Sequence, residues 1–166
     1  MPRLTVPPLP VVLLVLLGLF MLIAMFGTLV PGFVTDRVPK QFVPVSTWFF
    51  EFFGADLSTP DDQERWAGPI KLKAHICQVI IAATEGIISI TALAAACMPR
   101  RRVQLTHFSI GLAMGLFGAF MLTMFAIHSK DLPAWNQYPA IFAWLGITWL
   151  IVVTWERGLT NNAKPA

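Results

Sequence analysis

The chain has 166 residues, of which 56% are apolar and 13% are charged, and its formal net charge is +3. With a mean hydropathy of +0.67, this composition excludes an ordinary soluble domain and is typical of an integral membrane protein. The small basic excess is read as membrane topology, so no nucleic-acid partner is expected.

Four apolar stretches have about the 20 residues that a helix needs to cross a bilayer. They cover residues 9–33, 70–98, 105–127 and 138–155. Together they use most of residues 1–166, so the sequence predicts an all-α fold. We expect one integral membrane four-helix bundle with no separate soluble domain. The first stretch is far longer than the roughly 7–15-residue core of a signal peptide, and no Ala-x-Ala follows it, so we expect it to be a span.

The segment from 34 to 69 is the one sizeable region expected outside the membrane. It contains a run of aromatic residues that includes Trp48, Phe49 and Phe52. Such residues are typical of the headgroup level, so we predict an interfacial aromatic loop between the first and second spans. The loop caps the bundle or offers a surface for a partner. Thr59-Pro60 followed by acidic residues is typical of a helix start.

The second apolar stretch carries polar residues along one side. His75, Gln78, Ala82, Glu85 and Ser89 follow one another at spacings of three and four, which places them on one face of a helix. An ionised carboxylate in lipid costs about 3 kcal/mol on insertion scales. We therefore expect this face to point toward other helices and the second span to be the centre of the bundle.

Glu85 allows two interpretations. In the first it is a neutral acid that holds the bundle in register through donors on neighbouring helices, with Thr28, Ser109, Thr123 and Thr148 as candidates. In the second it belongs to a ligand or proton site formed with His75, Gln78 and Ser89.

Small residues mark the third span, and aromatic residues mark the fourth. Gly111, Gly115 and Gly118 form a shallow surface that another backbone can approach closely, either within the chain or from a partner. The fourth span carries Trp144, Trp149 and Trp155, which we interpret as anchors at the two membrane interfaces.

No motif in the sequence predicts catalysis, a metal site or a bound cofactor. Cys77 and Cys97 are too far apart on one helix to form a disulfide, and the three histidines lack a paired ligand spacing. No phosphate loop, nucleophile elbow or zinc signature is present. We therefore expect a chain that is not an enzyme, whose partners are other integral membrane proteins and lipids.

Basic residues predict the orientation. Arg100, Arg101 and Arg102 lie together in the short link between the second and third spans, with no acid nearby. Four spans place both termini on the same side as this link, which the positive-inside rule assigns to the cytosol or the matrix. Three membranes are candidates: the plasma membrane in a bacterium, and the endoplasmic reticulum or the mitochondrial inner membrane in a eukaryote.

Several short motifs carry a family resemblance. They are Leu17-Gly18-Leu19-Phe20 and Thr28-Leu29-Val30-Pro31 in the first span, Thr84-Glu85-Gly86 in the second and Tyr138-Pro139-Ala140-Ile141 in the fourth. Over residues 15–155 this layout resembles the DoxX-like superfamily, and within it the small four-span proteins that include the acetylcholine-receptor assembly chaperone. Relatives usually close the first span with Gly-x-x-Lys-Leu, whereas Thr28 takes the lysine position here.

The resemblance implies a membrane-embedded helper that binds and matures other membrane proteins through Glu85 and the glycine faces. The sequence thus favours a non-catalytic assembly chaperone or accessory subunit. Two alternatives stay open: a small-molecule or lipid-binding protein, which includes an enzyme, with its site around Glu85, and a proton or solute pathway. A pathway is disfavoured because only one ionisable group lies deep in the spans.

Overall fold

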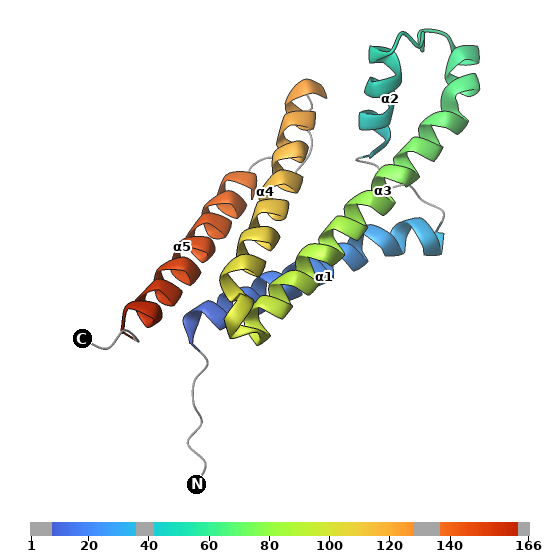
Figure 1. Cartoon of the computed structure of the whole chain (residues 1–166). Helices are drawn as coiled ribbons and strands as arrows, with labels where there is room; N and C mark the ends of the chain where they lie inside the picture. Colours follow the sequence, from blue (N-terminus) through green and yellow to red (C-terminus); the bar gives the residue numbers. More distant parts are fainter. Residues whose placement is uncertain (1–7, 36–41, 128–136, 163–166) are drawn as a thin grey trace.

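The structure is a computed structural model that describes residues 8–35, 42–127 and 137–162. This part of the chain is helical, without strands (Figure 1). The helices, in chain order, are α1 (Leu9–Thr35), α2 (Phe42–Phe52), α3 (Pro60–Cys97), the short 3-10 helix η1 (Pro99–Arg101), α4 (Arg102–Ile127) and α5 (Tyr138–Asn162).

Among these described residues, four helices are long and apolar enough to cross a membrane, namely α1, α3, α4 and α5. The prediction of an all-α chain with four such helices is confirmed. α1 ends two residues after the first predicted span, and α4 begins three residues before the third. α5 continues to Asn162 and so is seven residues longer than expected.

The segment predicted as a loop is mostly helical in its described part, residues 34–35 and 42–69; residues 36–41 of the predicted loop lie outside the described residues. It contains α2 and the first ten residues of α3, which begins at Pro60. Thr59 caps α3, because its side chain accepts a hydrogen bond from the Asp62 amide, and Pro60 occupies a position whose N–H would have no helical partner. The expected helix start at Thr59-Pro60 is therefore confirmed. Pro69 lies inside α3 and does not end it. A proline removes only one helical hydrogen bond, and the turns on either side keep theirs.

α3 is too long to lie entirely inside a bilayer. Its 38 residues extend about 57 Å at 1.5 Å per residue, whereas a hydrocarbon core is about 30 Å thick. Between Pro60 and Lys73 the helix carries six charged residues, and from Ala74 to Cys97 it carries Glu85 alone. The apolar part therefore begins near Ala74, four residues after the predicted start of the second span.

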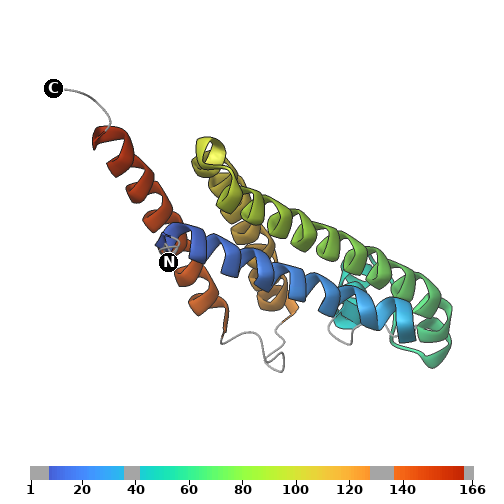
Figure 2. The same ribbon diagram turned by 90° about the horizontal axis from the view of Figure 1, so that it is seen from below.

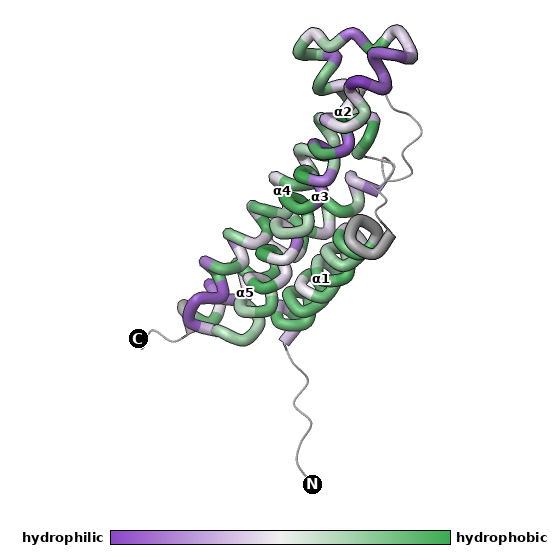
Figure 3. Tube along the Cα trace, turned by 90° about the vertical axis from the view of Figure 1, so that its right-hand side faces the viewer, coloured by the Kyte–Doolittle hydropathy of each residue, from purple (hydrophilic) through white to green (hydrophobic). Residues whose placement is uncertain are grey.

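The four long helices pack in a ring. α1 lies along α3, α3 contacts α4, α4 contacts α5, and α5 returns to α1 (Figures 1 and 2). α2 packs beside the first part of α3. Hydropathy along the chain divides the molecule into an apolar middle and two hydrophilic ends (Figure 3). One end holds the turn from α2 to α3, and the other holds η1, the start of α1 and the end of α5.

Small side chains let α1 and α3 approach closely. Ala82, Ala92 and Ala95 on α3 are almost wholly buried, and Leu17 and Met21 of α1 lie in the same interior. At Gly18 the approach is tightest, because a Cβ atom there would lie 2.6 Å from Leu93 Cγ and 3.2 Å from the Ser89 carbonyl oxygen. By contrast, large apolar side chains such as Ile23 and Ile90 on the outer faces are 71% and 69% exposed.

We predict that Gly18→Ala destabilises the fold by about 1–2 kcal/mol, because overpacking against Leu93 and the Ser89 backbone outweighs the better helix propensity of alanine. Gly86→Ala is expected to cost less, since its added Cβ would meet only Met25 Sδ, the flexible end of a side chain. Unfolding in detergent micelles measures both. Equal stability of the two variants would contradict the close α1–α3 approach at Gly18.

Candidate functional site

The polar row of α3 faces α1. Gln78, Glu85 and Ser89 are 2%, 7% and 1% exposed, and His75 at the outer end of the row is half-buried. The spacing of three and four that the sequence shows therefore corresponds to a single buried face, in an otherwise apolar surface. We call this contact the α1–α3 seam.

Two of these side chains bind backbone carbonyl groups of α1. Ser89 Oγ donates a hydrogen bond to the Gly18 carbonyl oxygen at 2.8 Å, and Gln78 Nε2 donates to the carbonyl oxygen of Thr28. Gly18 and Thr28 lie ten residues apart on α1, and their partners Ser89 and Gln78 lie eleven residues apart on α3 in the reverse order. The two helices therefore run antiparallel in a fixed register. Polar groups in an apolar interior need such partners, because each unpaired group costs a few kcal/mol.

Glu85 is only partly satisfied. The Thr28 side chain forms a hydrogen bond with its carboxyl group, while Oε2 is buried without a hydrogen-bond partner among the described residues. Of the four donors considered from the sequence, Thr28 is thus the one that reaches Glu85. Ser109 and Thr123 instead donate to carbonyl oxygens of their own helix, those of Thr106 and Ala119.

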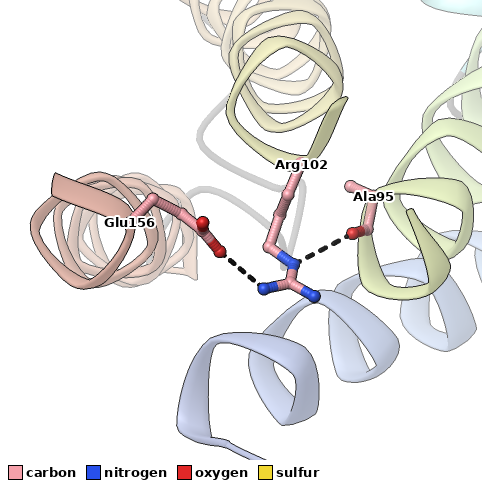
Figure 4. Close-up of polar contacts among 3 residues, drawn as sticks. All are labelled: Ala95, Arg102 and Glu156. Atoms are coloured by element: carbon pink, nitrogen blue, oxygen red, sulfur yellow. Dashed lines mark hydrogen bonds and ion pairs between the residues drawn. The ribbon is translucent and has the colours of Figure 1, made fainter. Parts of the chain in front are cut away.

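A second polar site, which the sequence analysis missed, joins three helices at the arginine-rich end. Arg102 at the start of α4 pairs with Glu156 of α5, and its Nε donates to the Ala95 carbonyl oxygen of α3 at 3.2 Å (Figure 4). That carbonyl lies four residues before Pro99, which has no N–H to donate, so the guanidinium supplies the missing helical donor. The Arg102 and Glu156 side chains are only 8% and 18% exposed.

The glycines predicted for close packing on α4 divide into two groups. Gly111 and Gly115 are exposed, and a Cβ atom added at either position would meet nothing within 4 Å. Ala119 continues the same exposed row one turn later. Gly118 lies nearer to α5, where its Cβ would be 4.0 Å from Phe142 Cζ. Within this chain, close helix contact is made at Gly18 and Gly86 instead.

The predicted aromatic contact residues lie on α2 and its end. Trp48 is half-buried and its ring stacks on that of Phe52, with centroids 5.6 Å apart. Phe49 lies beneath the ammonium group of Lys73 on α3, and Phe52 is 69% exposed. Beside them, a cleft of about 380 Å³ opens between α2 and the first part of α3. It is remote from Glu85 in sequence register, since its α3 lining ends at Lys71.

The two cysteines, Cys77 and Cys97, are free thiols. Comparison of the chain with protein-family models, with curated proteins and with solved structures found no significant match. The candidate functional features of the described residues are a buried polar seam between α1 and α3, an arginine–glutamate pair at one end, an open glycine row on α4 and an aromatic hairpin at the other end.

We predict that Glu156→Gln destabilises the fold by about 2–4 kcal/mol. Removing one partner leaves the Arg102 charge in a largely buried place without compensation, and the remaining exposure of residue 156 keeps the loss below that of a fully buried pair. Arg101→Gln, at an exposed neighbouring position, serves as the control and should change stability by less than about 0.5 kcal/mol. Thermal unfolding in micelles compares them, and equal effects would show that the pair contributes nothing.

Proposed function

We propose that this chain is a non-catalytic integral membrane helper, either an assembly chaperone or an accessory subunit of a larger membrane complex. Its partners on this proposal are other integral membrane proteins, in a lipid environment. The observation that supports it best is the open row of small residues on α4, formed by Gly111, Gly115 and Ala119. We call this row the α4 stripe.

The α4 stripe has the spacing and composition of a helix-docking surface. Its members recur every four residues, so they lie above one another on one side of the helix. In lipid, helices associate through close van der Waals packing, and small residues at this spacing allow two backbones to approach. Phe108 and Leu122, at the two ends of the stripe, are 54% and 75% exposed. A second helix placed on the stripe would bury these side chains as well.

The wider architecture that we propose is a four-span bundle that resembles the DoxX-like superfamily. The start of α1, η1 and the end of α5 lie at one end of the molecule (Figure 3), as an even number of crossings requires. We infer that this end, with Arg100 and Arg101 exposed on it, faces the cytosol or the matrix. The α2–α3 turn then faces the opposite compartment.

The alternative is a small-molecule or lipid site around Glu85. The observation that favours it is the buried Oε2 atom without a partner, because buried polar groups usually carry one. A ligand hydroxyl or amide would supply the missing donor, with Gln78 and Thr28 adjacent to it in the α1–α3 seam.

For the helper proposal we predict that Gly115→Leu lowers association with partner helices at least tenfold while leaving the unfolding of the chain unchanged within about 0.5 kcal/mol. The added side chain enters open space in this chain but would separate a docked helix. Ala143→Leu, an exposed small residue on α5, is the matched control. The chain is extracted gently from its native membrane, and native electrophoresis measures the fraction that is in complexes. A chain that is extracted wholly as a monomer and keeps its full function in that form would contradict the proposal.

For the Glu85 site the discriminating change is Glu85→Gln. The helper proposal expects fold and association to be kept, because an amide retains the hydrogen bond with Thr28. If Glu85 forms a ligand site, the variant should lose a lipid-like ligand that copurifies with the unchanged chain, because the variant lacks the carboxyl group. Native mass spectrometry of both forms reports bound lipid and partner together, and unchanged lipid binding in the variant would eliminate the ligand site.

A further inference from the structure

Three arginines at one end of the molecule carry exposed charge that no acid compensates. Arg100 and Arg101 in η1 and Arg157 near the end of α5 are exposed, and no ion pair or side-chain hydrogen bond within the described part of the chain engages them. Arg102 lies at the same end, but its guanidinium pairs with Glu156. The charges of this pair cancel, and those of the other three arginines remain.

The neighbouring segments concentrate positive charge at this end of the molecule (Figure 3). Residues 95–106 and 152–162 contain four arginines, one glutamate and no other charged residue, so their net charge is +3. Residues 51–64 at the opposite end contain five acids and no lysine or arginine. Such an asymmetry gives one end a field that attracts anions. We call residues 95–106 and 152–162 the arginine end.

The short link between α3 and α4 sets the height of Arg100 and Arg101 relative to the membrane. The apolar run of α3 ends at Met98, and that of α4 begins at Val103. Between them lies η1, a 3-10 helix of three residues, which rises about 6 Å at about 2 Å per residue. The headgroup layer on each side of a bilayer is about 5–8 Å thick. Since α3 and α4 are both long and apolar enough to cross the bilayer, the two arginines lie among the headgroups.

The ion pair places Arg157 at the same level. Arg102 follows η1 directly, and its guanidinium reaches Glu156, the residue before Arg157 (Figure 4). Trp155 lies two residues before Arg157 and is 45% exposed, and exposed tryptophan is typical of the headgroup level. The exposed arginines of η1 and of α5 therefore face one layer of the membrane.

Guanidinium groups at this height meet the phosphate groups of lipids. An arginine can hold a phosphate through two parallel hydrogen bonds, and each basic residue near the membrane surface favours an anionic membrane about fivefold. A zwitterionic headgroup carries a cation of its own, which the arginines repel. An acidic segment of a soluble protein fits less well, because the short link keeps the arginines inside the headgroup layer.

We propose that the arginine end binds anionic phospholipids, whose phosphate groups are held by Arg100, Arg101 and Arg157. The acyl chains of these lipids lie along exposed apolar side chains deeper in the membrane, such as Trp149 and Leu150 of α5, which are 40% and 55% exposed. This inference goes beyond the proposed helper function, because it names a class of lipid. It needs neither the α4 stripe nor the α1–α3 seam, so it can fail while the helper function stands.

The test offers the full chain two lipids that differ only in their headgroup. The chain is purified in a nonionic detergent and receives equal amounts of palmitoyl-oleoyl phosphatidylglycerol and palmitoyl-oleoyl phosphatidylcholine. Native mass spectrometry then counts the bound lipids of each kind. We expect phosphatidylglycerol to be bound about five times as often as phosphatidylcholine. This ratio should fall as the ionic strength rises, because the arginines are exposed and salt screens their charge.

Charge-removing variants locate the binding. Arg101→Gln/Arg157→Gln should lower the ratio by about threefold, because two of the three exposed arginines are lost. Arg65→Gln/Lys71→Gln makes the same change of charge at exposed positions toward the opposite end and should leave the ratio unchanged. Glu85→Gln should leave it unchanged as well, which separates this binding from a ligand site in the seam. Unfolding in micelles confirms that the variants keep their fold.

Equal binding of the two lipids, or an unchanged ratio in Arg101→Gln/Arg157→Gln, would overturn the inference. So would an equal loss in Arg65→Gln/Lys71→Gln. Two soluble competitors test other sources of negative charge: glycerol phosphate, which carries the headgroup phosphate alone, and a short peptide of alternating leucine and glutamate. Displacement of phosphatidylglycerol by either one at equal concentration would also overturn it. None of these results bears on Gly115→Leu, so the helper function is judged separately.

Discussion

The structure depends on one constraint, which is that the polar side chains of α3 must find partners inside an apolar surrounding. α1 meets this constraint with its backbone: the carbonyl oxygens of Gly18 and Thr28 accept hydrogen bonds from Ser89 and Gln78. Backbone acceptors require close approach, which explains why Gly18 and Gly86 lie at this contact. The α1–α3 seam is accordingly the most extensive helix contact in the described residues.

The two ends of the molecule are built differently around this seam. At one end, Arg102 satisfies both Glu156 and a carbonyl oxygen that Pro99 leaves without a donor, so a single side chain joins α3, α4 and α5. At the other end, α3 continues beyond the apolar part and pairs with α2 in a hairpin of aromatic and acidic residues. The first end holds the helices together, and the second exposes the rings of Phe52 and Phe53.

The sequence predicted features that depend on local pattern. The four apolar helices follow from composition and length, the start of α3 follows from Thr59-Pro60, and the buried row from Gln78 to Ser89 follows from spacing alone. Features that depend on which helices become neighbours were missed. Arg102 and Glu156 are 54 residues apart, so their pairing has no local signal, and Arg102 was interpreted only as a charge that sets topology.

The same limit applies to the glycines and to Glu85. The sequence favoured Gly111 and Gly115 because their spacing is a known contact pattern, yet the contacts within the chain use Gly18 and Gly86, whose neighbours Leu93 and Met25 come from another helix. Thr28 was one of four equivalent donors for Glu85 until the register of α1 and α3 selected it.

The central claim is that α3 is sheltered by α1 along its polar face, and disulfide trapping tests it most directly. In a Cys77→Ser/Cys97→Ser background, Met25→Cys with Gly86→Cys should form a cross-link within one chain, since the Met25 side chain meets the Cβ position of residue 86 at 2.9 Å. Ile23→Cys with Gly86→Cys should not, because Ile23 points outward. Efficient cross-linking of the second pair, or of the first only between two chains, would show that α1 does not cover the polar face of α3.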